Sequence, residues 1–90
     1  MDLQRIKQRI REFAASPKNV RFEEIDAFIR NQLIPSFGGS DRSRGSHCTY
    51  TVATETCQIV RRPNHIKECY VKGFLDRMEA LGLYEPEGGD

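Results

Sequence analysis

A short polar segment in the middle of the chain contains the residue types needed to bind and cleave a phosphodiester. Arg42 and Arg44 precede the run Gly45-Ser46-His47, and the only other histidine of the sequence is His65. An imidazole titrates near neutral pH, so it can take a proton from a ribose 2′-hydroxyl or give one to a leaving oxygen. Arginine can hold a phosphate through two parallel hydrogen bonds. His47 is therefore a candidate catalytic residue, and the simpler alternative is an exposed polar side chain at the start of a strand.

The residues after Gly45 alternate in polarity with a period of two, which is typical of a strand with one buried face. Cys48, Tyr50 and Val52 would face the core, and the residues between them would face away from it. The sequence therefore predicts that His47, Thr49 and Thr51 lie on an open sheet face beside a glycine-containing loop, which allows close approach of a ligand to the backbone.

The charge of the chain is concentrated in its middle. The formal net charge is only +1, but residues 42–72 contain six basic and two acidic side chains. Such a local excess indicates a candidate anion site, and a solvated polar face is the alternative. The candidate phosphate-binding residues in this stretch are Arg42, Arg44, Arg61, Arg62 and Lys67.

Composition indicates a small globular protein of one domain, residues 1–90, with 38% apolar residues and no apolar run of membrane-spanning length.

The three cysteines of the sequence show no CxxC spacing, which favours reduced thiols and a cytoplasmic location. His65 and Cys69 have the spacing of half a zinc site, but no second close pair follows, so we expect no metal and no other cofactor. A cysteine nucleophile is disfavoured because Cys48 and Cys57 would face the core.

Periodicity and turn residues predict an α+β fold of the order α-α-β-β-β-α, with helices on one face of a small three-stranded antiparallel sheet. We expect tyrosine and phenylalanine side chains such as Tyr50, Tyr70 and Phe74 to pack in or around the core rather than to stack on bases. Helices are expected at residues 2–15, 21–32 and 68–80; Pro35 would close the second helix and Gly82 would cap the last. Extended segments are expected at 34–37, 47–52 and 56–61. Residues 38–45 would form a flexible loop, and residues 85–90 a frayed tail.

Several short motifs of the sequence resemble, in their order and spacing, those of the HicA-type toxins, which are small ribonucleases partnered by HicB antitoxins. The resemblance covers about residues 5–84. The run Gly45-Ser46-His47-x-x-Tyr50 looks like the strand motif of the family, and the family's last strand and the step after it resemble Ile59 to Pro63 with His65. The first helix of the family resembles Phe22-Glu23-Glu24-Ile25 with Phe28-Ile29, and its closing helix resembles Tyr70-Val71 with Met78-x-x-Leu81-Gly82. The N-terminal extension of one subgroup resembles Gln8 to Asn19.

The resemblance implies a fold like that of a double-stranded-RNA-binding domain, here spanning residues 19–84 after a helical extension at 1–18. It implies metal-independent endoribonuclease activity on mRNA, with the catalytic histidine at His47 and Ser46 beside it in the phosphate-binding site, and a HicB-like antitoxin as partner. The loop before the motif is longer here than is usual in the family and contains arginine where the family often has lysine.

Two alternatives use the same fold without catalysis. One is an RNA-binding module, which the arginine-containing loop would suit. The other is a protein-interaction module, which is consistent with the small net charge.

Overall fold

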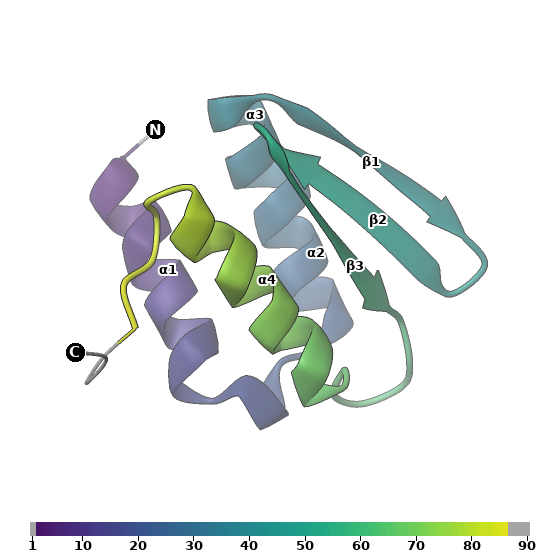
Figure 1. Ribbon diagram of the computed structural model, residues 1–90. Coiled ribbons are helices and arrows are strands. Elements are labelled where there is room, and N and C mark those ends of the chain that lie inside the picture. The colour runs from purple at the N-terminus through teal and green to yellow at the C-terminus, as the bar shows by residue number, and fades with distance from the viewer. Residues whose placement is uncertain (1, 87–90) are drawn as a thin grey trace.

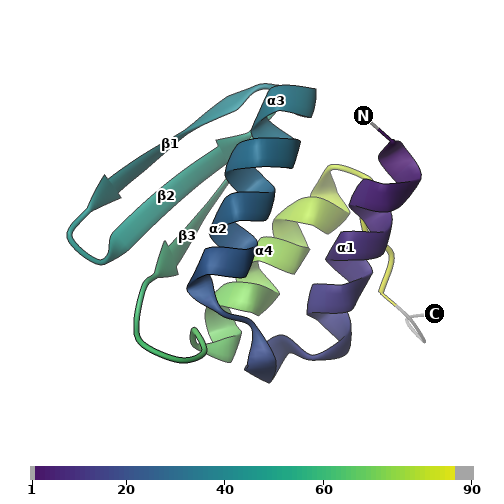
Figure 2. The same ribbon diagram turned by 180° about the vertical axis from the view of Figure 1, so that it is seen from behind.

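The computed structural model describes residues 2–86, and its element order is helix, helix, three strands, helix. The helices lie on one side of the sheet: α2 and α4 are next to it, and α1 is furthest from it (Figures 1 and 2). The α+β class and the three-stranded antiparallel sheet are therefore as predicted. No helix within residues 2–86 is long and apolar enough to cross a membrane. Of the predicted tail, residues 87–90 lie outside the described part of the chain.

The helices at the two ends of the chain begin and end close to their predicted bounds. α1 spans Leu3–Ala15, and its first turn is capped by the Asp2 side chain, which accepts a hydrogen bond from the Gln4 backbone N–H at 2.9 Å. α4 spans Glu68–Ala80. Gly82 follows it with φ +77°, and the Leu83 N–H donates to the Met78 carbonyl, so Gly82 terminates the helix as predicted.

The central helix continues past Pro35, so the prediction that this proline closes it was wrong. α2 (Phe22–Phe28) runs into a π-helical segment, η2 (Ile29–Leu33), and then into α3 (Ile34–Phe37). In the wider π turn the Ile34 N–H donates to the Ile29 carbonyl, which shifts the bonding pattern just before the proline and accommodates its missing N–H. Residues 34–37 are consequently helical and not extended.

The first strand lies where a flexible loop was predicted. β1 (Gly39–Arg44), β2 (His47–Val52) and β3 (Glu55–Val60) form an antiparallel sheet in the order β1-β2-β3. All six residues of β1 are exposed, so the strand has no apolar alternation by which the sequence could reveal it. Its backbone hydrogen bonds to β2 hold it in place, with Gly39 opposite Val52 and Arg44 opposite His47.

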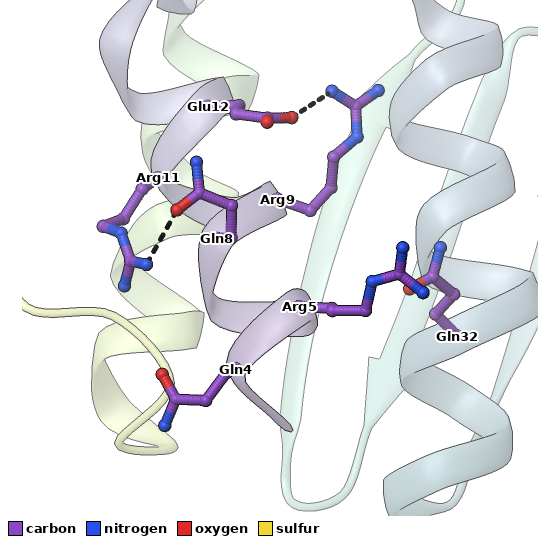
Figure 3. A pocket seen from close by; sticks show the side chains of 7 residues that line it. All are labelled: Gln4, Arg5, Gln8, Arg9, Arg11, Glu12 and Gln32. Carbon is purple, nitrogen blue, oxygen red and sulfur yellow. Dashed lines mark hydrogen bonds and ion pairs between the residues drawn. The ribbon is translucent and has the colours of Figure 1, made fainter. Parts of the chain in front are cut away.

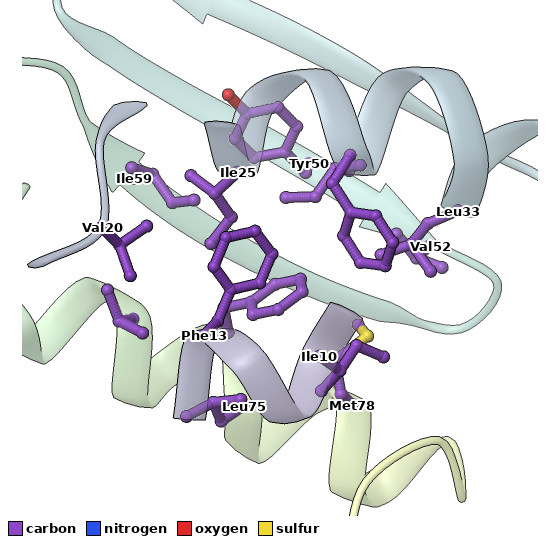
Figure 4. Close-up of a cluster of buried hydrophobic side chains, with 14 of the residues drawn as sticks. Ile10, Phe13, Val20, Ile25, Leu33, Tyr50, Val52, Ile59, Leu75 and Met78 are labelled. Carbon is purple, nitrogen blue, oxygen red and sulfur yellow. The ribbon is translucent and has the colours of Figure 1, made fainter. Parts of the chain in front are cut away.

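A single core fills the space between the sheet and the helices, and α1 contributes to it (Figure 4). The rings of Phe13, Phe28 and Phe74, one from each of α1, α2 and α4, meet edge to face with centroids 5.7–6.5 Å apart. The inward residues of β2 are buried as predicted: Cys48, Tyr50 and Val52.

β1 depends on a glycine at its first position. Gly39 has φ +145°, and a Cβ there would stand 1.9 Å from the Thr51 carbonyl oxygen of β2. We expect Gly39→Ala to destabilise the protein by at least about 2 kcal/mol, because the added methyl combines left-handed strain with a backbone clash. Urea denaturation would measure this. The matched control is Gly45→Ala, where φ is +61° but nothing lies within 4 Å of the added Cβ. Equal losses for the two variants would contradict the argument.

Candidate functional site

The strand register defines which side chains share the open face of the sheet. Residues directly opposite each other in an antiparallel pair point to the same side. Because Cys48 and Tyr50 are buried, His47 and Thr49 face away from the helices, and His47 is exposed as expected. The open face thus presents Ser40, Arg42 and Arg44 from β1, His47, Thr49 and Thr51 from β2, and Thr56, Gln58 and Val60 from β3.

This face has positive charges and no acidic side chain at any of its nine strand positions. The two acidic residues of the strands, Asp41 and Glu55, point toward the helices. Asp41 lies 3.5 Å from the Arg30 Nε, and Glu55 lies 3.5 Å from an Arg77 nitrogen. Within residues 2–86, Arg42 and Arg44 have no ion-pair partner. Their guanidinium groups are therefore available to an external anion.

A hollow of about 630 Å³ lies around His47 on this face. The Nδ1 atom of the imidazole is 3.2 Å from the Gln58 Nε2, a contact that holds the ring against β3. Arg44 is directly opposite His47, and Arg42 is two residues further along β1, opposite Thr49. The residues that line the hollow are Arg42, Ser43, Arg44, His47, Thr49 and Gln58.

The remaining predicted phosphate-binding residues do not line this hollow. Arg61 follows Ile59 at a spacing of two and so points to the helix side, where its guanidinium lies 5.3 Å from the centre of the Phe22 ring. Arg62 lies beyond the end of β3, and its Nε donates to the His65 carbonyl oxygen at 2.6 Å. Lys67 immediately precedes α4, whereas Ser46 is next to His47 in the β1–β2 turn.

β1 is held from the helix side by a chain of polar contacts. The Tyr50 hydroxyl donates to Asp26 Oδ1 at 2.7 Å, and Arg30 lies 3.7 Å from Asp26 Oδ2 and 3.5 Å from Asp41 Oδ2. Burial and the neighbouring Asp26 raise the pKa of the Tyr50 phenol far above its ordinary value. Tyr50 is thus a neutral hydrogen-bond donor in the core and does not stack on a ligand at the open face.

The cysteines do not form a reactive centre with His47. Cys48 is buried, and burial raises the pKa of the Cys57 thiol to about 11 despite the nearby Arg77, so Cys57 is protonated at neutral pH. Among residues 2–86, no three His, Cys, Asp or Glu side chains are grouped closely enough to hold a metal ion.

A second, slightly larger hollow of about 710 Å³ lies against the polar face of α1, which is rich in arginine and glutamine (Figure 3). Its arginines are partly engaged: Arg9 pairs with Glu12 at 2.9 Å and with Glu24 at 3.7 Å, and Arg11 donates to Gln8 at 2.9 Å. The lining contains no histidine or cysteine, and its only acid, Glu12, is bound to Arg9. Proton transfer near neutral pH is better served by the hollow around His47.

Sequence reasoning did not identify Gln58 and Thr49 as site residues. The signal was present for Gln58, because Cys57 and Ile59 were assigned to the core face and the residue between them had to face outward. The same alternation, continued by two residues, places Arg61 on the helix side.

No protein-family model, no curated protein sequence and no solved structure matches the chain. The likeness to the HicA-type toxins therefore rests on the short motifs quoted above.

Proposed function

We propose that the chain is a metal-independent endoribonuclease that acts on mRNA, similar to the HicA-type toxins. In this proposal the core after α1 corresponds to the double-stranded-RNA-binding-domain-like fold of those proteins, the location is cytoplasmic, and a HicB-like antitoxin is the partner. The observation that carries the proposal is the open sheet face. It combines an exposed imidazole with two guanidinium groups that are unpaired within residues 2–86, and none of its nine strand positions has a carboxylate to repel a phosphodiester.

The geometry suggests a simple division of roles. Arg42 and Arg44 are two residues apart on one strand face, a spacing of about 7 Å, so they can bind neighbouring phosphates of an RNA strand. His47 takes the proton from a ribose 2′-hydroxyl at its Nε2. The 2′-oxygen then attacks the adjacent phosphorus, the bond from phosphorus to the 5′-oxygen breaks, and the imidazolium returns a proton to that oxygen. The products are a 2′,3′-cyclic phosphate end and a 5′-hydroxyl end.

Binding by the two arginines is tested by salt dependence. Each arginine that neutralises a phosphate of a single strand contributes about 0.7 to the slope of log K against log salt concentration. We expect Arg42→Gln/Arg44→Gln to lower the slope by about 1.4 and to weaken binding to an unstructured RNA oligonucleotide, measured by fluorescence anisotropy. The matched control is Arg5→Gln/Arg11→Gln on α1. A larger loss in the α1 double variant would contradict the assignment of the binding face.

Cleavage is tested with the same oligonucleotide in the presence of a chelator, with the product ends identified by mass spectrometry. Cyclic phosphate products support the proposal. Salt-dependent binding without any cleavage would instead support a non-catalytic RNA-binding module, and the absence of both would favour a protein-interaction module.

A further inference from the structure

Gln58 is the one side chain in the described part of the chain that hydrogen bonds to the imidazole of His47. It lies on β3 opposite Thr49, and its neighbours Cys57 and Ile59 are directed toward the core, which fixes its own side chain on the open face. We propose that Gln58 is a positioning residue that sets which ring nitrogen of His47 carries the proton, an inference that rests on the proposed function. Such control matters because only an unprotonated nitrogen can act as a base.

The terminal amide of glutamine can present either a donor or an acceptor to the same neighbour, depending on rotation about its last bond. When the amide nitrogen donates to Nδ1, the proton of the neutral ring is on Nε2. When the amide oxygen instead accepts from Nδ1–H, the lone pair of Nε2 is free to take the proton of the 2′-hydroxyl. The second arrangement also keeps an acceptor on Nδ1–H after the ring becomes cationic. In the structure the Gln58 Nε2 faces Nδ1, so the proposal requires that the amide turn by half a rotation about its last bond and present its oxygen to His47 during the reaction.

The surroundings of His47 make this acceptor important. The charged groups that face the ring are Arg44, directly opposite on β1, and Arg42, further along the same strand. β3 contributes Gln58 and the apolar Val60, and the helices lie on the other side of the sheet. Both charged neighbours are arginines, which carry only hydrogen-bond donors, so neither can accept a hydrogen bond from the ring. The Gln58 oxygen is the acceptor that β3 offers to Nδ1–H.

The experiment compares Gln58→Met, which keeps the side-chain length but removes the amide, with Gln58→Glu, which places a permanent acceptor there. We expect Gln58→Met to lower cleavage about 10-fold and to shift the acidic limb of the pH–rate profile to lower pH, because the cationic ring loses its acceptor. We expect Gln58→Glu to move that limb upward by about one pH unit, because a carboxylate stabilises the imidazolium. Gln32→Met is the matched control, because Gln32 lies in η2 and lines the hollow at α1 and not the one around His47, and this variant should match the wild type.

A second readout does not depend on activity. Long-range ¹H–¹⁵N correlation spectra of the histidine ring report the tautomer directly, and we expect Gln58→Met to change the Nδ1 and Nε2 shifts of His47 but not those of His65. His47-dependent cleavage by the wild type, together with unchanged rates and unchanged ring shifts in Gln58→Met, would overturn this inference and leave the proposed function standing. The absence of RNA cleavage by the wild type would overturn both.

Discussion

Replacing His47 with alanine should reduce RNA cleavage by about 10²- to 10⁴-fold, the usual contribution of a positioned general acid or base. The side chain is exposed on the open face and has no part in the core, so the variant should fold as the wild type does. Binding should change little, because the phosphate contacts are assigned to Arg42 and Arg44. The measurement is a single-turnover cleavage rate near pH 7, with circular dichroism and oligonucleotide affinity recorded on the same sample.

The chain supplies a matched control for this experiment in its second histidine. His65 lies in the connection between β3 and α4, and its structural role is through the backbone, which forms an isolated bridge with Arg21 and accepts a hydrogen bond from Arg62. His65→Ala should therefore retain full cleavage. Wild-type rates in His47→Ala, or an equal loss in both variants, would rule out a specific proton-transfer role for His47.

Removing the Phe74 ring should cause the largest loss of stability. Phe74 is 0% exposed, and its ring packs edge to face against Phe13 at 6.1 Å and Phe28 at 6.5 Å. Phe74→Ala would leave a cavity where α1, α2 and α4 meet, at a cost of about 3–5 kcal/mol. In a domain of this size the melting temperature should fall by at least about 12 °C.

The same substitution at an exposed site separates burial from residue type. Phe37, at the end of α3, is 36% exposed and has no place in the core cluster. Phe37→Ala should cost less than about 1 kcal/mol. Thermal melts of the two variants and the wild type provide the comparison, and similar melting temperatures for both variants would contradict the described core.

The parts of the fold that were predictable from the sequence are those in which apolar periodicity and terminal residues agree. α4 has an apolar stripe and ends with Gly82, and β2 alternates strictly, so both were located correctly. β1 was missed because none of its residues is buried. Backbone pairing with β2 and the ion pair of Asp41 with Arg30 hold the strand, and neither produces an apolar pattern in the local sequence. The prediction that Pro35 ends the helix was wrong because the π turn before it shifts the backbone hydrogen bonds. That turn depends on how Ile29 and Leu33 pack in the core.

The sequence predicted the placement of the candidate site residues best where one strand register determines it. The arginines expected beside His47 are beside it, although they lie on a paired strand and not on a loop. Arg62 and Lys67 could not be placed, because they follow the end of β3 and alternation no longer determines their direction. The contact between Gln58 and His47 joins residues on different strands and needs the register of β2 with β3.

The complete exposure of β1 has a consequence for how this surface can change over time. Its arginines have no contact with the core, so substitutions there alter what the sheet face binds at little cost in folding. The ligand preference of the sheet face can therefore change through substitutions in β1 while the helices and the packed rings of Phe13, Phe28 and Phe74 stay the same.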